Sequence, residues 1–183
     1  MIVILTLEIG TQLWPTLRDD LAYQRLLILN GEWFRLLSAG LTHTNLYHAL
    51  LNLGALFIIS QTYPKQTEGW KSVAILMYLI ATSSLLVLTL YPNIDWFVGI
   101  SGALHGFLIW LAINDWKQHR WLNSTVIAVV IAKVVWEQFF GGSSATSGLI
   151  GARVLIEGHM AGAICALVSA PLAVLFLRNS PEK

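Results

Sequence analysis

Residues 99–106 read GISGALHG, and this stretch decides the fold because it places a serine at the start of an apolar segment. Gly99 and Gly102 flank Ser101, and Gly106 follows one helical turn further on. A helix from Ser101 to about residue 115 is shorter than the roughly 20 apolar residues that a straight membrane crossing requires. It therefore begins below the membrane surface, after a non-helical loop. Such backbone is tolerated at that depth only where protein covers it or it lines a water-filled cavity, so the stretch predicts a wet pocket inside the membrane.

The composition is that of an integral membrane protein. Of the 183 residues, 56% are hydrophobic and 11% are charged, and the mean hydropathy is +0.65. A soluble domain usually has about 25% charged residues. The net charge of +1 gives no reason to expect a nucleic-acid partner. Cys165 is the only cysteine and lies in an apolar run, so the sequence predicts no disulfide and no cysteine-based metal site.

Six segments are predicted to cross the membrane, and residues 1–183 are expected to form a single domain. The fold class is therefore all-α: a polytopic bundle of six helices with a short central fourth helix. The segments are approximately residues 1–17, 45–63, 69–91, 101–115, 121–140 and 156–178. The first carries Glu8 but has no basic start and no cleavage site, so we interpret it as a membrane helix and not as a removed signal peptide.

The connection between the first two segments, about residues 18–44, is predicted to be solvent-facing or interfacial. Its charged residues are Arg18, Asp19, Asp20, Arg25, Glu32 and Arg35. Counting basic residues between the segments favours, by a small margin, both termini on the inner side of the membrane. That orientation puts Ser101 near the outer face.

Ser101 and His159 are candidates for a nucleophile and its general base. A serine hydroxyl is a poor nucleophile until a base removes its proton, and an unperturbed histidine titrates near neutrality. Gly102 and Gly106 on one helix, and Gly162 and Ala166 on the other, would let the two helices approach closely. The alternative is that these glycines only pack helices together and that Ser101 bonds to its own backbone.

His48 and Asn52 lie four residues apart, so they share one helix face and can both donate hydrogen bonds to an oxyanion. The alternative is a polar pair that only holds two helices together. For a third member of the catalytic group, Asp95 lies in a loop and Glu157 is too close in sequence to His159 to orient it. The residues therefore indicate a Ser–His dyad.

The combined pattern resembles the rhomboid family of intramembrane serine proteases over nearly the whole chain. It consists of Gly99-x-Ser101-Gly102, the His48-x-x-x-Asn52 helix, and His159 followed by Ala161-Gly162; the segment from Arg35 through His43 to His48 is similar to the family's first outer loop. The resemblance implies that Ser101 is the nucleophile, that His159 is the base, and that His48 and Asn52 stabilise the oxyanion. It also implies lateral substrate entry near the second and fifth helices.

One position departs from the family pattern, because His105 stands where rhomboids usually have a tyrosine or phenylalanine. We expect its ring to stack under His159, as the usual aromatic does; the alternative is that His105 shares the role of base. The octapeptide 99–106 and Lys133-x-x-x-Glu137-Gln138 look like the rhombosortase branch. Lys133 and Glu137 share a helix face and are interpreted as an ion pair with a possible role in substrate recognition, the alternative being a purely structural pair.

The rhombosortase resemblance implies an endopeptidase of the bacterial inner membrane with its active site facing the periplasm. Its partners would be membrane lipid and transmembrane substrates with a C-terminal sorting helix, the GlyGly-CTERM tail. No metal and no organic cofactor is implied. Glu8 and Arg153 receive no role from the sequence.

Three other functions compete with this interpretation. A haem-binding membrane protein would use the histidines at 48, 105 and 159, but it leaves Ser101 and Asn52 unexplained. A catalytically inactive rhomboid relative that binds client proteins would typically lack the serine or the histidine. A zinc intramembrane protease would need a motif such as His-Glu-x-x-His, which the chain does not contain.

Overall fold

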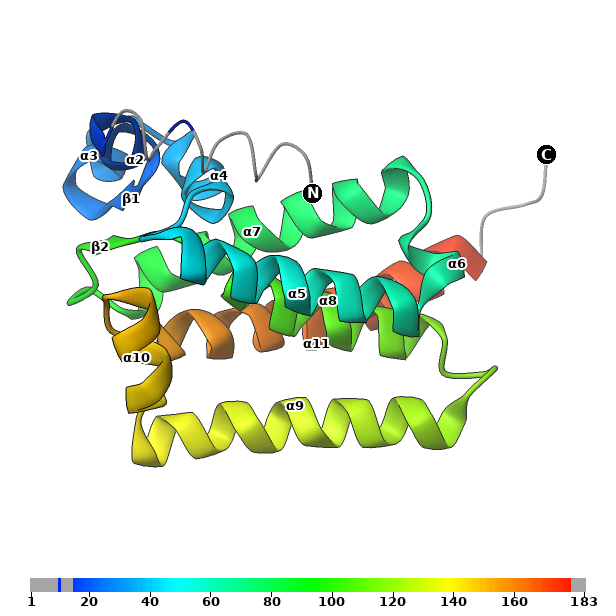
Figure 1. Cartoon of the computed structure of the whole chain (residues 1–183). Helices are drawn as coiled ribbons and strands as arrows, with labels where there is room; N and C mark the ends of the chain where they lie inside the picture. Colours follow the sequence, from blue (N-terminus) through cyan, green and yellow to red (C-terminus); the bar gives the residue numbers. More distant parts are fainter. Residues whose placement is uncertain (1–9, 11–14, 179–183) are drawn as a thin grey trace.

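Five long helices lie alongside one another in the computed structural model, which describes Gly10 and residues 15–178 (Figure 1). They are α5 (Leu46–Thr62), α7 (Trp70–Leu90), α8 (Ser101–Asn114), α9 (Arg120–Phe140) and α11 (Ile156–Arg178). Each coincides with a predicted membrane segment. The predicted first segment, residues 1–17 with Glu8, lies outside the described residues except at its end, so the count of six remains a prediction.

The shorter elements occupy the connections between these helices. Those before α5 are α2 (Pro15–Leu21), β1 (Tyr23–Gln24), α3 (Arg25–Leu29), α4 (Arg35–Ser38) and η1 (Ala39–Leu41). The later ones are α6 (Pro64–Thr67), β2 (Trp96–Phe97) and α10 (Ser144–Ile150). Strands β1 and β2 pair antiparallel, with Tyr23 opposite Phe97 and Gln24 opposite Trp96.

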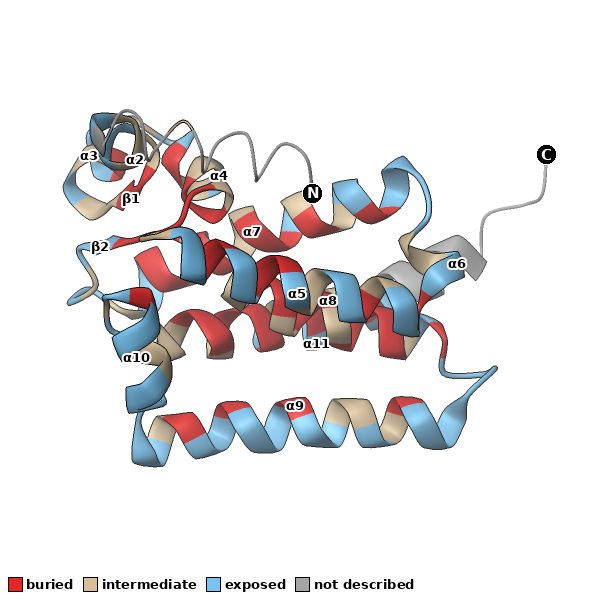
Figure 2. Ribbon diagram, in the orientation of Figure 1, coloured by how far each residue is buried: buried red, intermediate tan, exposed pale blue. Residues whose placement is uncertain are grey.

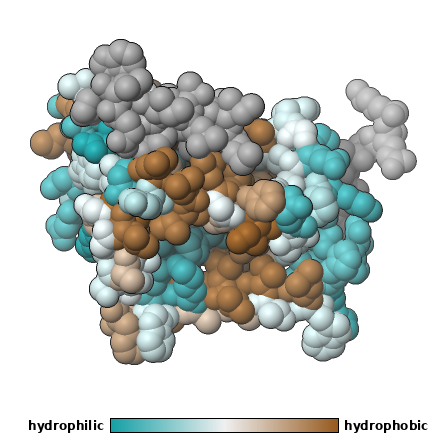
Figure 3. Space-filling model, viewed as in Figure 1, coloured by the Kyte–Doolittle hydropathy of each residue, from teal (hydrophilic) through white to brown (hydrophobic). Residues whose placement is uncertain are grey.

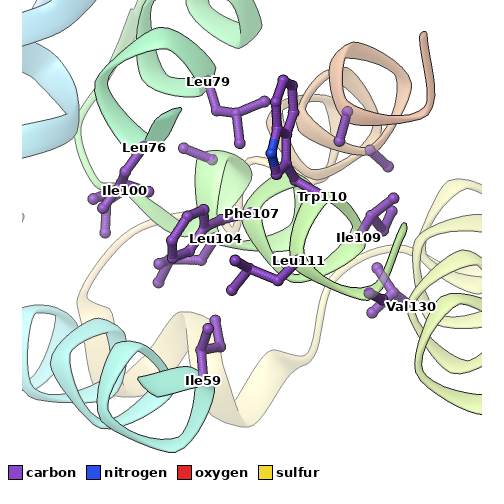
Figure 4. Packing of buried hydrophobic residues seen from close by; sticks show 14 of the residues in the cluster. Ile59, Leu76, Leu79, Ile100, Leu104, Phe107, Ile109, Trp110, Leu111 and Val130 are labelled. Carbon is purple, nitrogen blue, oxygen red and sulfur yellow. The ribbon is translucent and has the colours of Figure 1, made fainter. Parts of the chain in front are cut away.

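Helix α8 forms the centre of the bundle and packs against α5, α7, α9 and α11. A helix that is apolar on all sides is stable only when it is buried, and the residues of α8 are mostly buried in Figure 2. Leu104 and Phe107 of α8 belong to the main hydrophobic core, together with Leu76 of α7, Ile59 of α5 and Val130 of α9 (Figure 4). At about 1.5 Å per residue, its 14 residues span about 21 Å, less than the hydrocarbon core of a bilayer.

Large apolar side chains cover the outward faces of the surrounding helices. Phe57 and Ile58 of α5 and Trp136, Phe139 and Phe140 of α9 are more than half exposed. In Figure 3 hydrophobic atoms form a band across the middle of the molecule, between more hydrophilic ends. Among the described residues, α7 and α9 are long and apolar enough to cross a bilayer, and α5, α8 and Ile156–Leu172 are shorter apolar helices. Such a band suits contact with lipid and not with water.

The connection before α5 folds into a small lobe and is not simply an exposed loop. Arg35, which the sequence analysis placed among solvent-facing charges, is only 5% exposed. Its guanidinium donates to the carbonyl oxygens of Asp19 and Ala22, each at 2.8 Å, and pairs with Glu32 at 2.7 Å. Burial of this charge is possible because backbone carbonyls and a carboxylate satisfy it. The lobe thereby holds together several short elements that have little apolar periodicity of their own.

Candidate active site

Ser101 is the first residue of α8, and the chain that leads to it is held by the folded lobe. The N–H of Gly99 donates to the carbonyl oxygen of Ala39 at 2.8 Å, and β2 pairs with β1 just before this point. Gly99 has φ +110°, a conformation that favours glycine. A Cβ atom there would also lie 2.6 Å from Cε1 of His48. The sequence Gly99-Ile100 thus lets the backbone turn into α8 directly beside a histidine.

His159 lies in the first turn of α11, opposite Ser101. Its Nε2 atom is 3.1 Å from the Ser101 hydroxyl oxygen, within hydrogen-bonding distance. The two helices approach so closely because Gly102 and Gly106 of α8 contact the backbone at Gly158 and Gly162 of α11. The sequence predicted that the α8 glycines would meet Gly162 and Ala166, whereas in the structure Gly158 takes the place of Ala166. This shift of one turn towards the start of α11 brings the contact to the level of His159.

Glu137 of α9 contacts the other nitrogen of the same imidazole. Its Oε2 atom is 2.7 Å from Nδ1 of His159, and its Oε1 atom accepts a hydrogen bond from Nζ of Lys133 at 2.6 Å. An ionised carboxylate can only accept hydrogen bonds. The contact therefore places the imidazole proton on Nδ1, which leaves the Nε2 lone pair directed at the Ser101 hydroxyl.

The sequence indicated a Ser–His dyad, with neither Asp95 nor Glu157 suited to orient His159. The structure corrects the expectation that no acidic residue contacts His159, because the carboxylate in contact with the imidazole belongs to Glu137. Glu157 instead pairs with Arg153, whose Nη2 atom lies 2.9 Å from both carboxylate oxygens. A carboxylate inside an apolar helix is expensive and is a functional candidate by default, and this signal could have pointed to Glu137.

His105 lies one turn beyond Ser101 on α8 and stacks on His159. The ring centroids are 4.2 Å apart and the planes are inclined by 23°. Nδ1 of His105 donates to the carbonyl oxygen of Ser101 at 2.7 Å, because a carbonyl can only accept. The ring therefore supports the imidazole of His159 from the side, and its Nδ1 proton goes to the backbone of Ser101 and not to the hydroxyl.

His48 and Asn52 of α5 complete the polar lining. Both are more than 90% buried, and the Nδ2 group of Asn52 has no hydrogen-bond partner among the described residues. Nδ1 of His48 lies 3.1 Å from the hydroxyl of Thr44, which donates to the carbonyl oxygen of Ile150 at 2.6 Å. Thr44, which the sequence analysis did not single out, thus links His48 to α10.

A cavity of about 570 Å³ opens in front of these side chains. Its polar lining includes His48, Asn52, Ser101, His105, Arg153 and His159. Ser101 and His159 come from α8 and α11, whereas Asn52 and His48 come from α5. The cavity therefore lies where three helices meet, at the end of the bundle that carries β2 and α10 (Figure 1). Arg153, without a role in the sequence analysis, lines this cavity while paired with Glu157.

The stacked rings of His105 and His159 are poorly arranged to share a metal ion or a haem. Ligand atoms of His105, Glu137 and His159 lie within 4.8 Å of one another. The two imidazoles are nearly parallel, however, so their lone pairs do not converge on one point, and both nitrogens of His159 already have protein contacts. A haem held by both His105 and His159 would lie between their rings, and the 4.2 Å stack leaves no space there for a macrocycle.

Comparison with known proteins identifies the family of this chain. The rhomboid domain family matches residues 30–176, which include α5, α7, α8, α9 and most of α11 together with the side chains of the candidate site. Among curated proteins, none shows significant sequence similarity to the chain. The rhomboid family consists of membrane-embedded serine proteases that act on transmembrane substrates. Because the family match covers most of the chain, this chain belongs to the rhomboid family.

Proposed function

We propose that this protein is an intramembrane endopeptidase in which Ser101 is the nucleophile and His159 is the general base. The observation that carries the proposal is the 3.1 Å contact between the Ser101 hydroxyl and Nε2 of His159, at the wall of a cavity. A hydroxyl and an unprotonated imidazole nitrogen at this distance are the arrangement that activates a serine. Two further donors, from His48 and Asn52, line the same cavity.

In the first half of the reaction, the Ser101 oxygen attacks the carbonyl carbon of the peptide bond while its proton passes to Nε2 of His159. The resulting oxyanion accepts hydrogen bonds from Asn52 Nδ2, from His48 and from the N–H of Ser101. That N–H belongs to the first residue of α8 and has no acceptor within the helix. In the tautomer with the proton on Nε2, the Nδ1 atom of His48 accepts from the backbone N–H of Thr44 at 3.5 Å, and Nε2 donates to the oxyanion.

The second half releases both products. The C–N bond breaks as His159 returns its proton to the leaving amine, and an ester links the substrate to Ser101. A water molecule then attacks the ester and gives its proton to His159. The ester bond breaks, the Ser101 oxygen regains a proton, and the new carboxylate product leaves. Because polar side chains line part of this cavity inside an apolar bundle, it provides the place where water can reach the ester.

We infer that the substrates are membrane-anchored proteins with C-terminal GlyGly-CTERM tails, cleaved near the outer face of the bacterial inner membrane. The support is the sequence at 99–106 together with Lys133, Glu137 and Gln138, which look like the rhombosortase branch. The distribution of basic residues, with both termini inside, favours the same face. The exposed apolar faces of α5 and α9 suit contact with a substrate helix in the membrane.

The proposal is tested by co-expressing the protein with a reporter that carries a GlyGly-CTERM tail. Wild type, Ser101→Ala and His159→Ala are compared by immunoblot, with membrane insertion checked for each. A second reporter with an unrelated transmembrane tail serves as the substrate control. Ser101→Ala and His159→Ala are expected to abolish cleavage and to insert normally.

Three outcomes are informative. Serine-dependent cleavage of the GlyGly-CTERM reporter alone supports both the mechanism and the substrate class. Cleavage of both reporters supports the protease but contradicts the sorting specificity. Full cleavage by either alanine variant contradicts the proposed Ser–His pair.

A further inference from the structure

We propose that Glu137 is the third member of the catalytic group: a positioning residue that orients His159 and stabilises its protonated form. The inference rests on the proposed serine protease function and adds a residue to the Ser–His dyad. The proposal comes from one line of contacts across three helices. Glu137 of α9 bonds to Nδ1 of His159 at 2.7 Å, and Nε2 of the same ring faces Ser101 of α8 at 3.1 Å.

The contact selects the tautomer that a base needs. A free imidazole can carry its proton on either nitrogen, and a proton on Nε2 would prevent His159 from accepting one from Ser101. The carboxylate of Glu137 can only accept while it is ionised, and Lys133 at 2.6 Å favours the ionised form. Glu137 therefore keeps the proton on Nδ1 and the ring plane aimed at Ser101.

The burial of this pair makes the interaction strong. Glu137 is 8% exposed and His159 is 4% exposed, so little water screens the contact. When His159 accepts the serine proton it becomes positively charged, and a carboxylate at hydrogen-bonding distance stabilises that charge more effectively in a medium of low dielectric than in water. Lys133 is an exposed residue, which lets its ammonium group remain solvated while it partly balances the carboxylate.

A second contact fixes α9 against α11 at the same level. The side-chain amide of Gln138, the residue after Glu137, donates to the carbonyl oxygen of Ile156 at 3.1 Å. Ile156 is the first residue of α11, three positions before His159. The adjacent residues Glu137 and Gln138 thus hold the start of α11 together, one at the catalytic ring and one at the backbone.

The competing role is recognition of substrate by the Lys133–Glu137 pair. The two roles predict different kinetics. If Glu137 acts through His159, Glu137→Gln lowers kcat and changes KM little, because the amide can present its N–H to the imidazole and favour the wrong tautomer. If the pair recognises substrate, Glu137→Gln and Lys133→Gln both raise KM to a similar extent.

The experiment measures kcat and KM for reporter cleavage in wild type, Glu137→Gln, Glu137→Asp and Lys133→Gln, with Ser101→Ala as the inactive reference. In parallel, the rate at which a fluorophosphonate probe labels Ser101 reports activation of the serine without a peptide substrate. Thermal unfolding in detergent identifies any variant that fails to fold. Loss of the positioning acid costs about 10⁴-fold in kcat in soluble serine proteases. We therefore expect Glu137→Gln to lose about 100-fold or more in both kcat and labelling rate.

Glu137→Asp is expected to recover part of that loss. Lys133→Gln leaves the contact between Glu137 and His159 in place, so its kcat is expected to fall by less than about tenfold. The inference is overturned if the labelling rate and kcat of Glu137→Gln are within about threefold of the wild-type values. It is also overturned if Glu137→Gln raises only KM, and by about as much as Lys133→Gln does. If either of these results is found while wild-type cleavage still depends on Ser101, the proposed function stands without this inference. If wild type neither cleaves nor labels, the proposed function and this inference both fall.

Discussion

Gly102 of α8 and Gly158 of α11 are in direct backbone contact: a Cβ atom on Gly102 would come within 2.6 Å of the Gly158 carbonyl oxygen. A backbone oxygen cannot rotate away as a side chain can. Any substituent on Gly102 therefore moves one helix relative to the other. Because Ser101 and His159 are the immediate chain neighbours of these two glycines, such a movement separates the hydroxyl from the imidazole.

Gly102→Ala is accordingly expected to destabilise the protein by about 1–3 kcal/mol, the usual cost of overpacking, and to abolish cleavage. Gly54→Ala in α5 is the matched control, because a Cβ atom at Gly54 meets nothing within 4 Å. Thermal unfolding in detergent and reporter cleavage measure the two effects. Equal behaviour of the two variants would contradict the proposed role of close helix contact.

Asn52→Ala tests the oxyanion donor on α5. Because the Nδ2 group is buried without a partner among the described residues, its removal should lower kcat by about 10²–10³-fold with little change in KM. Asn114→Ala is a suitable control: the Asn114 amide donates to the Trp110 carbonyl oxygen at the opposite end of α8. Steady-state cleavage rates of the two variants are compared. If Asn52→Ala were as fast as wild type, Asn52 would not be an oxyanion donor.

His105 is expected to tolerate an aromatic replacement. His105→Phe keeps a ring against His159 and should retain activity within about tenfold, because an aromatic stack contributes about 0.5–1.5 kcal/mol. His105→Ala removes the stack and should be slower than His105→Phe. Cleavage assays on both variants show whether the aromatic stack is what activity requires. If phenylalanine proved as damaging as alanine, the ring nitrogens of His105 and not its stacking would be required.

Asp115, just after α8, is predicted to contribute stability without affecting the active site. Its buried carboxylate accepts hydrogen bonds from Gln66 at 2.6 Å, His119 at 2.7 Å and Asn123 at 3.1 Å. Burial alone would raise the pKa of Asp115, but these hydrogen bonds together lower it below its ordinary value of 3.8. A lowered pKa means that the folded state favours the ionised form, so this stabilisation is complete above about pH 4 and is lost as the pH falls through the lower, folded-state pKa.

Asp115→Ala should therefore reduce the free energy of unfolding by about 1–3 kcal/mol, the cost of leaving buried donors unpaired, with kcat unchanged. Glu68→Ala, at an exposed acidic residue, is the control and should have little effect. Unfolding followed by circular dichroism between pH 3 and 7 measures the difference. If Asp115→Ala were as stable as wild type at pH 7, this hydrogen-bond cluster would have no structural role.

Much of the helical framework could be predicted because the signals are local. The apolar runs and their breakers placed α7 within one residue of Trp70–Leu90 and α9 within one residue of Arg120–Phe140. The folded lobe before α5 could not be predicted in the same way. It depends on the buried guanidinium of Arg35 and on strand pairing between Tyr23 and Phe97, which are far apart in the chain.

In the candidate site, too, local signals could be predicted and contacts between distant segments could not. Residue type and spacing were enough to single out Ser101, His159, His48 and Asn52, because polar groups in apolar helices are costly and few. They did not indicate that Glu137, 22 residues before His159, bonds to its imidazole. They also did not indicate that Thr44 contacts both His48 and Ile150.

The chain's own pattern of apolar runs, glycines and isolated polar residues predicted a membrane bundle with a short central helix and a set of polar groups suited to acyl transfer. Those properties depend on hydrophobicity and helix periodicity, which act within a segment. The partner of each polar group was decided only when the helices packed. That choice follows from the backbone contact of Gly102 with Gly158 and from the depth at which α9 meets α11. It gives His159 a carboxylate on one nitrogen and a hydroxyl on the other.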